Sequence, residues 1–387
     1  MATPLKLTAK AMRRLRNGHL WIYQDELTGA RPELHGGIVE VKDPEGKFFG
    51  FGFFSHGSKI AVRILTRMGQ LPDRVFFKEK IRRAGLKRKA KTLPHTAARL
   101  VNAESDLIPG LVVDWYAGQI VAQCLVPGVD KLCEMFAEIL WEEFNPHGLW
   151  FRNDAAGREM EGLPLEKLFW RGKETPEVVI EEAGVKYMVN LLEGHKTGSY
   201  LDQAENHIRA SEFASGRCLD AFCFQGGFAL HLAKKADEVV AVDSSDAALS
   251  VLGKNLELNR ITNVMQIRDN IFDILPEMAK QGDKFKLIVL DPPPFAKSKK
   301  DLASATKGYY ELNRRAISLL EPEGILITYS CSYNFSLSEL LETAQKAAAD
   351  QGRQARLLEI HTQAKDHPVL LSMPETFYLK GLVLEVD

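Results

Sequence analysis

Strands and helices alternate strictly along this chain from about residue 217. Strand-like runs are separated by segments whose apolar residues recur at helical spacing. The runs lie at 217–223, 238–244, 264–269, 286–291 and 324–330. Such alternation is typical of a parallel sheet that helices cover on both faces. We therefore expect the second half of the chain to be a Rossmann-like α/β domain.

The first half of the chain has a different pattern. Residues 36–66 combine β-rich runs with turn signals, as expected of a small barrel, whereas residues 72–190 mix short strands with helices. The segment 377–386 reads as one more strand of the α/β domain. We therefore predict an all-β barrel over 1–70, a central α+β domain over 71–190 and a Rossmann-like domain over 191–387.

Charge is distributed unevenly along the 387 residues. The formal net charge is −1, but residues 1–100 hold 21 Lys and Arg against 8 Asp and Glu. A basic segment joined to an acidic remainder is typical of a protein that binds a polyanion through the basic segment. For the most basic run, 78–91, the alternative is a helix face that is simply solvated.

The five cysteines lack paired CxxC spacing. We therefore expect free thiols, with neither a disulfide framework nor a structural zinc site. The sequence also has no apolar run of the roughly 20 residues that a membrane span needs. These features together predict a folded cytoplasmic protein without a bound metal.

Polar residues follow the ends of the predicted strands, where open α/β sheets bind their ligands. The first strand ends in Asp220 and leads to a turn with Gly226 and Gly227, which lets backbone N–H groups approach a ligand closely. The GxGxxG pattern of NAD-binding domains is missing, which favours the looser turn of methyltransferases. Asp243 ends the second strand about 20 residues further on, where a carboxylate can accept both ribose hydroxyls. The alternatives are an ordinary turn and, for Asp243, an N-cap.

Two further segments suit the same ligand. The third strand ends in Asp269-Asn270, a natural place to contact an adenine edge. Before the sheet, Lys196, Thr197 and Gly198 form a small polar loop that suits a lid over a charged cofactor. Just after this loop, Asp202 with Glu205 has the spacing of a capping box, and helix capping is the alternative function of that pair.

The fourth strand ends in Asp291-Pro292-Pro293-Pro294-Phe295. Prolines remove backbone donors and stiffen the loop, so we expect Asp291 to be held in a fixed position. A fixed carboxylate can accept a hydrogen bond from the amine of a flat base, and Phe295 offers a stacking surface. The alternative is a proline-rich turn with a capping Asp.

Cys331 follows the fifth strand, next to the loop that carries Asp291. Carbon 5 of cytosine is too weak a nucleophile to take a methyl group directly. A thiolate that adds at carbon 6 activates carbon 5, and this needs one reactive cysteine and one acidic group on the base. Both occur at adjacent strand ends, whereas the other four cysteines are expected to be buried apolar side chains.

Several long motifs in this chain resemble the RlmI-type family of 23S ribosomal RNA cytosine-5 methyltransferases, and the resemblance covers nearly the whole chain. GHLWIY with the barrel segment looks like the PUA domain of that family, and RLVNAESDLIPGLVVDWY and REMEGLP look like its central domain. The catalytic domain is matched by GHKTGSYLDQ, DAFCFQGGFALHLA, DPPPF, YSCS and DHPVLL…YLKG.

This resemblance implies roles for particular residues. An S-adenosylmethionine site would be lined by Lys196, Thr197, Asp202, Gln203, Asp220, Phe222, Gly226, Asp243, Asn270 and Asp291. Asp291 would also hold the target cytosine beside Pro292, Pro293 and Phe295, and Cys331 would attack it. The chain departs from the family where Gln225 replaces Thr, Asn270 replaces Asp and Pro294 replaces Lys.

Two other functions remain open. A methyltransferase that acts on a guanine nitrogen shares the DPPxF turn but needs no cysteine, and a non-catalytic RNA-binding assembly factor needs only the basic module. The resemblance is also consistent with a homodimer. It leaves open which nucleotide is modified, whether the substrate is naked RNA or an assembled subunit, and which base removes the carbon-5 proton, for which His367 is a candidate.

Overall fold

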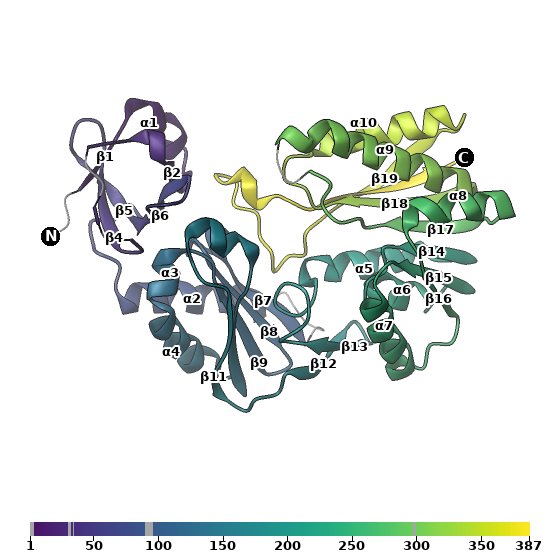
Figure 1. Cartoon of the computed structure of the whole chain (residues 1–387), viewed down its shortest axis with the longest axis horizontal. Coiled ribbons are helices and arrows are strands. Elements are labelled where there is room, and N and C mark those ends of the chain that lie inside the picture. The colour runs from purple at the N-terminus through teal and green to yellow at the C-terminus, as the bar shows by residue number, and fades with distance from the viewer. Residues whose placement is uncertain (1–3, 30–31, 34, 90–95, 297–298) are drawn as a thin grey trace. The chain divides into compact units, whose positions relative to one another are not determined.

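A computed structural model describes residues 4–29, 32–33, 35–89, 96–296 and 299–387 (Figure 1). The chain forms two compact units, each assembled from three segments. The first consists of Met1–Glu181, Val189–Leu201 and Lys365–Thr376, and the second of Glu182–Met188, Asp202–Ala364 and Phe377–Asp387. Each unit is described by itself below.

The first unit begins with a β-rich module. Its strands form one sheet in the order β2-β6-β5-β4-β1-β3. They are β1 (Leu5–Leu7), β2 (Trp21–Tyr23), β3 (Leu27–Thr28), β4 (Ile38–Lys42), β5 (Phe48–Phe54) and β6 (Ile60–Thr66). The predicted β-rich barrel is thus confirmed, and helix α1 (Ala9–Arg16), which the sequence pattern did not indicate, is added to it. Leu15 of α1 is fully buried, so the helix contributes to the core of the module.

Two glycines explain how β5 packs so closely against β6. A Cβ atom on Gly50 would lie 2.5 Å from the carbonyl oxygen of Thr66, and one on Gly52 would lie 2.6 Å from that of Arg63. Such distances are below van der Waals contact, so any side chain at these positions would push the two strands apart. The alternating Phe and Gly of 48–54 therefore give a tightly curled pair of strands.

A second sheet in the first unit has the order β11-β10-β9-β8-β7. Strands β9 and β10 are parallel and are linked through two helices, while the other neighbours are antiparallel. The elements are α2 (Arg74–Lys89), β7 (Ala97–Asn102), β8 (Leu111–Tyr116), β9 (Gln119–Cys124), α3 (Pro127–Lys131), α4 (Cys133–Phe144), β10 (Gly148–Asn153) and β11 (Glu166–Gly172). A short hairpin of β12 (Glu177–Glu182) and β13 (Val185–Asn190) follows.

Helix α2 carries most of the basic run 78–91. Phe77, Ile81 and Ala84 face the core, whereas Arg83 and Lys87 are exposed. Arg88 is buried and forms a bidentate ion pair with Asp106, with N–O distances of 2.9 and 2.6 Å. The run is therefore neither a uniform solvated face nor a uniform basic patch.

The second unit contains the predicted parallel sheet. Its strand order is β16-β15-β14-β17-β18-β20-β19. The strands are β14 (Arg217–Ala221), β15 (Glu238–Asp243), β16 (Val264–Arg268), β17 (Phe285–Leu290), β18 (Leu320–Ser330), β19 (Ala355–Thr362) and β20 (Lys380–Val386). The first five are parallel, whereas β20 runs antiparallel to both β18 and β19. The predicted Rossmann-like architecture is confirmed, with β19 as a strand that the sequence reading missed.

Helices cover both faces of this sheet (Figure 1). Helices α8, α9 and α10 lie on one face and α5, α6 and α7 on the other. Their bounds are α5 (Ala204–Glu212), α6 (Gly227–Leu232), α7 (Asp246–Asn259), α8 (Ile271–Gln281), α9 (Leu302–Leu319) and α10 (Leu337–Asp350). The strand order reverses between β14 and β17, which places the ligand-binding edge at the carboxyl ends of these central strands. In the described part of the chain, no helix is both long and apolar enough to cross a bilayer.

Candidate active site

The turn after β14 holds an unusual backbone conformation. Phe222 and Phe224 have φ angles of 68° and 49°, and Gly226 has a φ of 92°. Positive φ is costly for a residue with a side chain, and such conformations gather at functional sites. A Cβ atom on Gly226 would lie 2.4 Å from Leu252 Cδ1, so glycine is required there for space as well as for conformation.

Asp220 lies beneath this turn with its carboxylate fully buried. Its Oδ2 accepts a hydrogen bond from Ala229 N at 2.8 Å, but its Oδ1 has no partner among the described residues. Burial raises the pKa of Asp220 to about 7. A buried carboxylate oxygen without a donor is costly, so this atom marks a place where a donor from a bound molecule fits. The amino group of an amino-acid cofactor is such a donor.

Asp243 closes the turn from the next strand. Its Oδ2 accepts a hydrogen bond from Phe224 N at 2.9 Å, and its Oδ1 accepts one from Ser245 N at 2.8 Å. The N-cap of α7 is Ser245, whose hydroxyl accepts from Ala248 N at 3.2 Å. Asp243 therefore does not cap this helix, and it fixes the glycine turn through its two hydrogen bonds.

Asn270 has a structural role that the sequence did not reveal. It is the N-cap of α8, and its Oδ1 accepts a hydrogen bond from Phe272 N at 2.9 Å. The side-chain oxygen that was expected to contact adenine is therefore already engaged. The neighbouring Asp269 is exposed at the same strand end, and Asp269 N bonds to the carbonyl of Asp243 at 3.2 Å.

Asp291 and Cys331 lie at neighbouring strand ends. Strands β17 and β18 are parallel with Leu290 opposite Thr328, so both residues emerge at the same edge of the sheet. Gln203 donates from its Nε2 to Asp291 Oδ2 at 2.9 Å, which links the N-terminal end of α5 to this edge of the sheet. Cys331 is half-buried. Asp291 and Cys331 thus follow the ends of adjacent parallel strands.

The proline loop differs in detail from the expected stacking wall. Pro292 is buried, whereas Pro293 and Pro294 are exposed. Phe295 is half-buried, with its ring centroid 4.7 Å from that of Tyr309. One side of the Phe295 ring is thus packed against α9, and only the remaining surface is available to a ligand. The next helix along the chain, α9, has Asp301 as its N-cap, so Asp291 does not cap it.

Asp202 is buried, and its Oδ2 accepts a hydrogen bond from Tyr378 OH at 2.8 Å. The N-cap of α5 is Gln203, which makes no side-chain cap bond, so the alternative of a capping box with Asp202 is wrong. Gln203 is also buried and accepts from Asn206 Nδ2 at 2.6 Å. Both residues hold the start of α5 in place beside Asp291.

Lys196 and Thr197 belong to the first unit. Thr197 is fully buried, and its hydroxyl donates to Asp114 Oδ2 at 2.6 Å and lies 2.8 Å from Tyr116 OH. Its side chain is therefore engaged within its own unit. His367 also belongs to the first unit, where its Nδ1 lies 2.8 Å from Asp366 Oδ1. This contact fixes the orientation of the ring.

A buried cluster behind the glycine turn was missed entirely. His207 Nδ1 lies 2.9 Å from Glu182 Oε1, and His231 Nε2 lies 3.0 Å from the same oxygen. A Cβ atom on Gly227 would meet His207 Nε2 at 2.5 Å, so the imidazole packs directly against the start of α6. Burial opposes the charge on His207, but Glu182 outweighs burial and raises its pKa. The three residues are distant in sequence and follow no motif.

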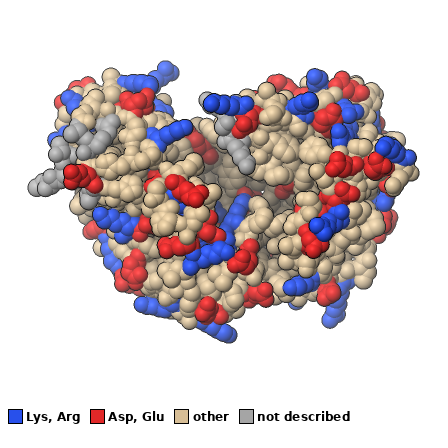
Figure 2. All heavy atoms as spheres, in the orientation of Figure 1, with Lys and Arg blue, Asp and Glu red and all other residues tan. Residues whose placement is uncertain are grey.

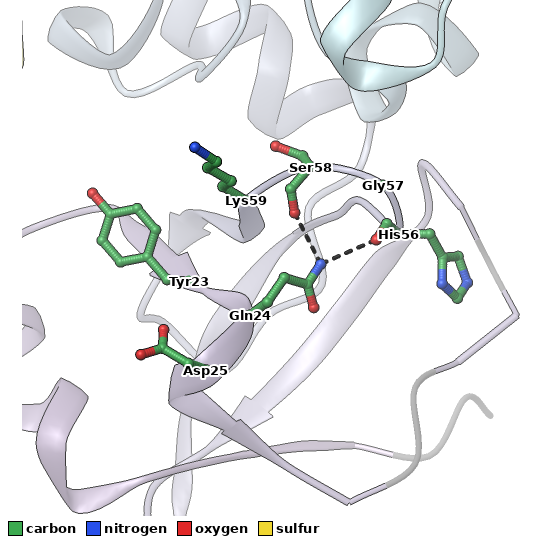
Figure 3. Close-up of a pocket in the computed structure, with 7 residues that line it drawn as sticks. All are labelled: Tyr23, Gln24, Asp25, His56, Gly57, Ser58 and Lys59. Carbon is green, nitrogen blue, oxygen red and sulfur yellow. Dashed lines mark hydrogen bonds between the residues drawn. The ribbon is translucent and has the colours of Figure 1, made fainter. Parts of the chain in front are cut away.

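The first unit has an open pocket between β2 and the turn that joins β5 to β6 (Figure 3). Gln24 donates from its Nε2 to the carbonyl oxygens of Ser55, His56 and Ser58 at 3.0 to 3.1 Å, which fixes the turn. Tyr23 and Lys59 extend on one side of Gln24 and His56 on the other (Figure 3). The pocket thus combines aromatic and cationic side chains. On the face drawn in Figure 2, basic and acidic side chains are interspersed.

Comparisons with known proteins agree with this description. A PUA-like domain family matches residues 5–67, and a methyltransferase domain family matches residues 213–371. A solved methyltransferase in complex with S-adenosylhomocysteine superposes with a TM-score of 0.86 at 20% identity, covering 99% of each chain. The fold and the strand-end site thus define an S-adenosylmethionine-dependent methyltransferase with a PUA-like module.

Two curated relatives match along the full length. Ribosomal RNA large subunit methyltransferase I of Pseudoalteromonas atlantica is 37% identical over 394 residues, covering 100% of both chains. The protein of the same name in Aeromonas salmonicida is 40% identical over 376 residues, covering 95% of both chains. The chain belongs to the ribosomal RNA large subunit methyltransferase I family.

Proposed function

We propose that this protein methylates carbon 5 of a cytosine in 23S ribosomal RNA, with Cys331 as its covalent nucleophile. The observation that carries the proposal is the juxtaposition of Cys331 and Asp291 at the ends of the adjacent parallel strands β18 and β17. The names of the full-length relatives support ribosomal RNA as the substrate. A methyltransferase acting on a guanine nitrogen would not need a thiol at this place.

S-adenosylmethionine supplies an electrophilic methyl group when it is bound. Asp220 fits its amino group, since Oδ1 of this buried carboxylate lacks a donor among the described residues. Asp243 fits the ribose hydroxyls, and Phe222 and Gly226 shape the turn between them. Asp269 is a better candidate than Asn270 for the adenine amine, because it has a second carboxylate oxygen besides the Oδ1 that accepts from Asn270 N, whereas the one side-chain oxygen of Asn270 caps α8. Lys196, Thr197, Asp202 and Gln203 complete the proposed site.

In the proposed reaction the Cys331 thiolate forms a bond to carbon 6 of the cytosine. The electron pair of the carbon 5–carbon 6 double bond then becomes available at carbon 5, which takes the methyl group. A base removes the proton from carbon 5, the double bond re-forms, and the bond from sulfur to carbon 6 breaks. Asp291 would hold the base beside Pro292, Pro293 and Phe295, and His367 is the proposed proton acceptor.

The remaining features concern the RNA. We place the main RNA-binding surface in the basic segment 1–100. The chain would be organised in three domains, 1–70, 71–190 and 191–387. The pocket of Tyr23 and Lys59 offers a stacking ring and a cation to RNA. The target cytosine must be unstacked, because its reacting face cannot be reached inside a helix. The protein would act in the cytoplasm, and a homodimer is consistent with its PUA-like module.

Nucleoside mass spectrometry tests this function. Unmodified 23S ribosomal RNA is incubated with methyl-labelled S-adenosylmethionine and with wild type, Cys331→Ala or Cys133→Ala. Cys133 is also half-buried but lies in the first unit, so it is the matched control. We expect labelled 5-methylcytosine from wild type and Cys133→Ala and none from Cys331→Ala. A labelled guanine, or label that survives Cys331→Ala, would overturn the mechanism.

A further inference from the structure

Lys380 is a buried lysine next to the proposed nucleophile. It is the first residue of β20 and pairs with Ser330 of β18 in antiparallel register. Its side chain is almost entirely shielded, with 2% of the residue exposed. Lys380 Nζ donates a hydrogen bond to the carbonyl oxygen of Ser332 at 2.7 Å. The lysine therefore spans from the residue before Cys331 to the residue after it.

Among the described residues, no carboxylate pairs with this ammonium group. Within the residues that the structure describes, Lys380 takes part in no ion pair, and the Ser332 carbonyl is its one hydrogen-bond acceptor. A buried cation without a counter-charge is costly, because desolvation is not offset by attraction. Burial accordingly lowers the pKa of Lys380 to about 8, while the charges of Cys331 and Glu339 oppose that shift.

The other titratable groups near Lys380 and Cys331 show which of them could balance the charge of Lys380. Glu339 lies on α10, where its carboxylate accepts from Ser336 N in a capping box. Asp291 lies at the end of β17 and accepts from Gln203. Tyr309 of α9 is buried, and burial raises the pKa of its hydroxyl, so it stays neutral. Cys331 is the group nearest in sequence and register that can supply a negative charge to Lys380.

We infer that Lys380 is a positioning residue whose ammonium group holds Cys331 as a thiolate for attack on the base. The inference rests on the proposed function of Cys331 and extends it by naming the source of its reactivity. A thiolate beside a cation has a lowered pKa, because the cation stabilises the charged form. A Cys331 thiolate would in turn supply the counter-charge that Lys380 lacks among the described residues.

The pH dependence of alkylation tests this inference without RNA. Wild type, Lys380→Gln and Lys380→Arg are treated with iodoacetamide across a pH series, and the rate at Cys331 is followed by peptide mass spectrometry. We expect the midpoint of the wild-type profile to lie below about 8.5, the ordinary value of a thiol. Lys380→Gln should move it upward by about 1 to 2 units, and Lys380→Arg should keep it low.

The neutral variant Lys380→Gln and the charged variant Lys380→Arg separate the effect of the charge from the effect of packing. A merely structural lysine would leave the alkylation midpoint of Cys331 the same in Lys380→Gln and Lys380→Arg, and that outcome would overturn the inference. Should Lys380→Gln fail to fold, as judged by circular dichroism, a wild-type midpoint at or above about 8.5 would overturn it equally. A low alkylation midpoint of Cys331, found together with methyl transfer by Cys331→Ala, would contradict the proposed function. It would leave the inferred effect of Lys380 on the Cys331 thiol standing.

Discussion

The Asp220 carboxylate combines complete burial, one missing partner and a pKa of about 7. We expect its ionised form to bind the cationic amine of the cofactor, so affinity should rise as pH increases from about 6 to about 8. Asp220→Asn should weaken binding of S-adenosylhomocysteine roughly 10-fold and remove this pH dependence, because a charge-assisted hydrogen bond is lost. Calorimetry at several pH values measures both effects.

The matched control is Asp246→Asn. Asp246 is an exposed carboxylate at the start of α7 in the same unit, with 80% of its side chain exposed. Its replacement should leave affinity and pH dependence unchanged. Equal affinity of wild type at both ends of the pH range would contradict the role given to Asp220.

Asn270 and Asp269 offer a second test at the scale of single residues. Asn270→Ala should destabilise the protein by about 1 kcal/mol through loss of the α8 cap, and Asn270→Asp should not, because Asp caps equally well. Asp269→Asn should weaken binding of S-adenosylhomocysteine instead, with little effect on stability. Thermal denaturation and calorimetry on the three variants distinguish the roles. Weaker binding in Asn270→Ala but not in Asn270→Asp, with unchanged binding in Asp269→Asn, would restore the original prediction.

At the scale of elements, Glu182 joins β12 to helices α5 and α6 through His207 and His231. Burial opposes its ionisation, but the two imidazoles outweigh burial and lower the pKa of Glu182 to about 2. The stabilisation is therefore present above the unfolded pKa near 4.5 and is lost as pH falls toward 2. The pKa of His207 is raised, and the stabilisation from its charged form is lost as pH rises through that pKa. The ion pair of Glu182 with His207 therefore stabilises the fold only between these two limits of pH.

Glu182→Gln should therefore lower the thermal midpoint most strongly between about pH 5 and pH 6.5, because it leaves a buried imidazolium without its partner, at a cost of about 3 kcal/mol. Glu181→Gln changes a neighbouring carboxylate and is the control. Thermal scans at a series of pH values would reveal the window. A loss of stability that is the same at every pH would mean that packing, and not charge, is what Glu182 contributes.

Much of the second unit could be predicted because its signals are local. Alternating strands and helices give a parallel sheet, and residues that end neighbouring strands must meet at one edge, as Asp291 and Cys331 do. Lys380 and His207 could not be found this way. Lys380 reaches the carbonyl oxygen of Ser332, next to Cys331, only because β20 inserts beside β18, and His207 meets Glu182 only after β12 and α5 have packed. Such pairings depend on tertiary order that no short window of sequence contains.

The capping errors have the same origin. Asn270 follows a strand end just as Asp243 does, and its sequence position fits either a cap or a ligand contact. Which function a side chain serves depends on where the next helix begins, and helix ends are the least predictable part of an element. The structure shows that α7 begins after Ser245 and α8 after Asn270.

At the scale of the whole molecule, the charge asymmetry predicts that RNA is held through phosphates by the basic segment 1–100. Arg83→Glu with Lys87→Glu on α2 should weaken RNA binding and reduce its dependence on salt, since phosphate contacts release counterions. Lys235→Glu with Lys254→Glu, two exposed residues of the second unit, is the control of equal charge change. Filter binding at several salt concentrations measures the slope. Affinity that does not fall with added salt would contradict the prediction.

The position of β20 has a consequence for the order of synthesis. Among the seven strands of the parallel unit it is the last along the chain, yet it lies inside the sheet between β18 and β19. Until β20 has been synthesised, β18 lacks its antiparallel neighbour, and the carbonyl oxygen of Ser332 lacks the lysine that donates to it. The parallel strands β14, β15, β16 and β17 can pair among themselves earlier, so the edge of the sheet that carries Cys331 is completed only when β20 inserts.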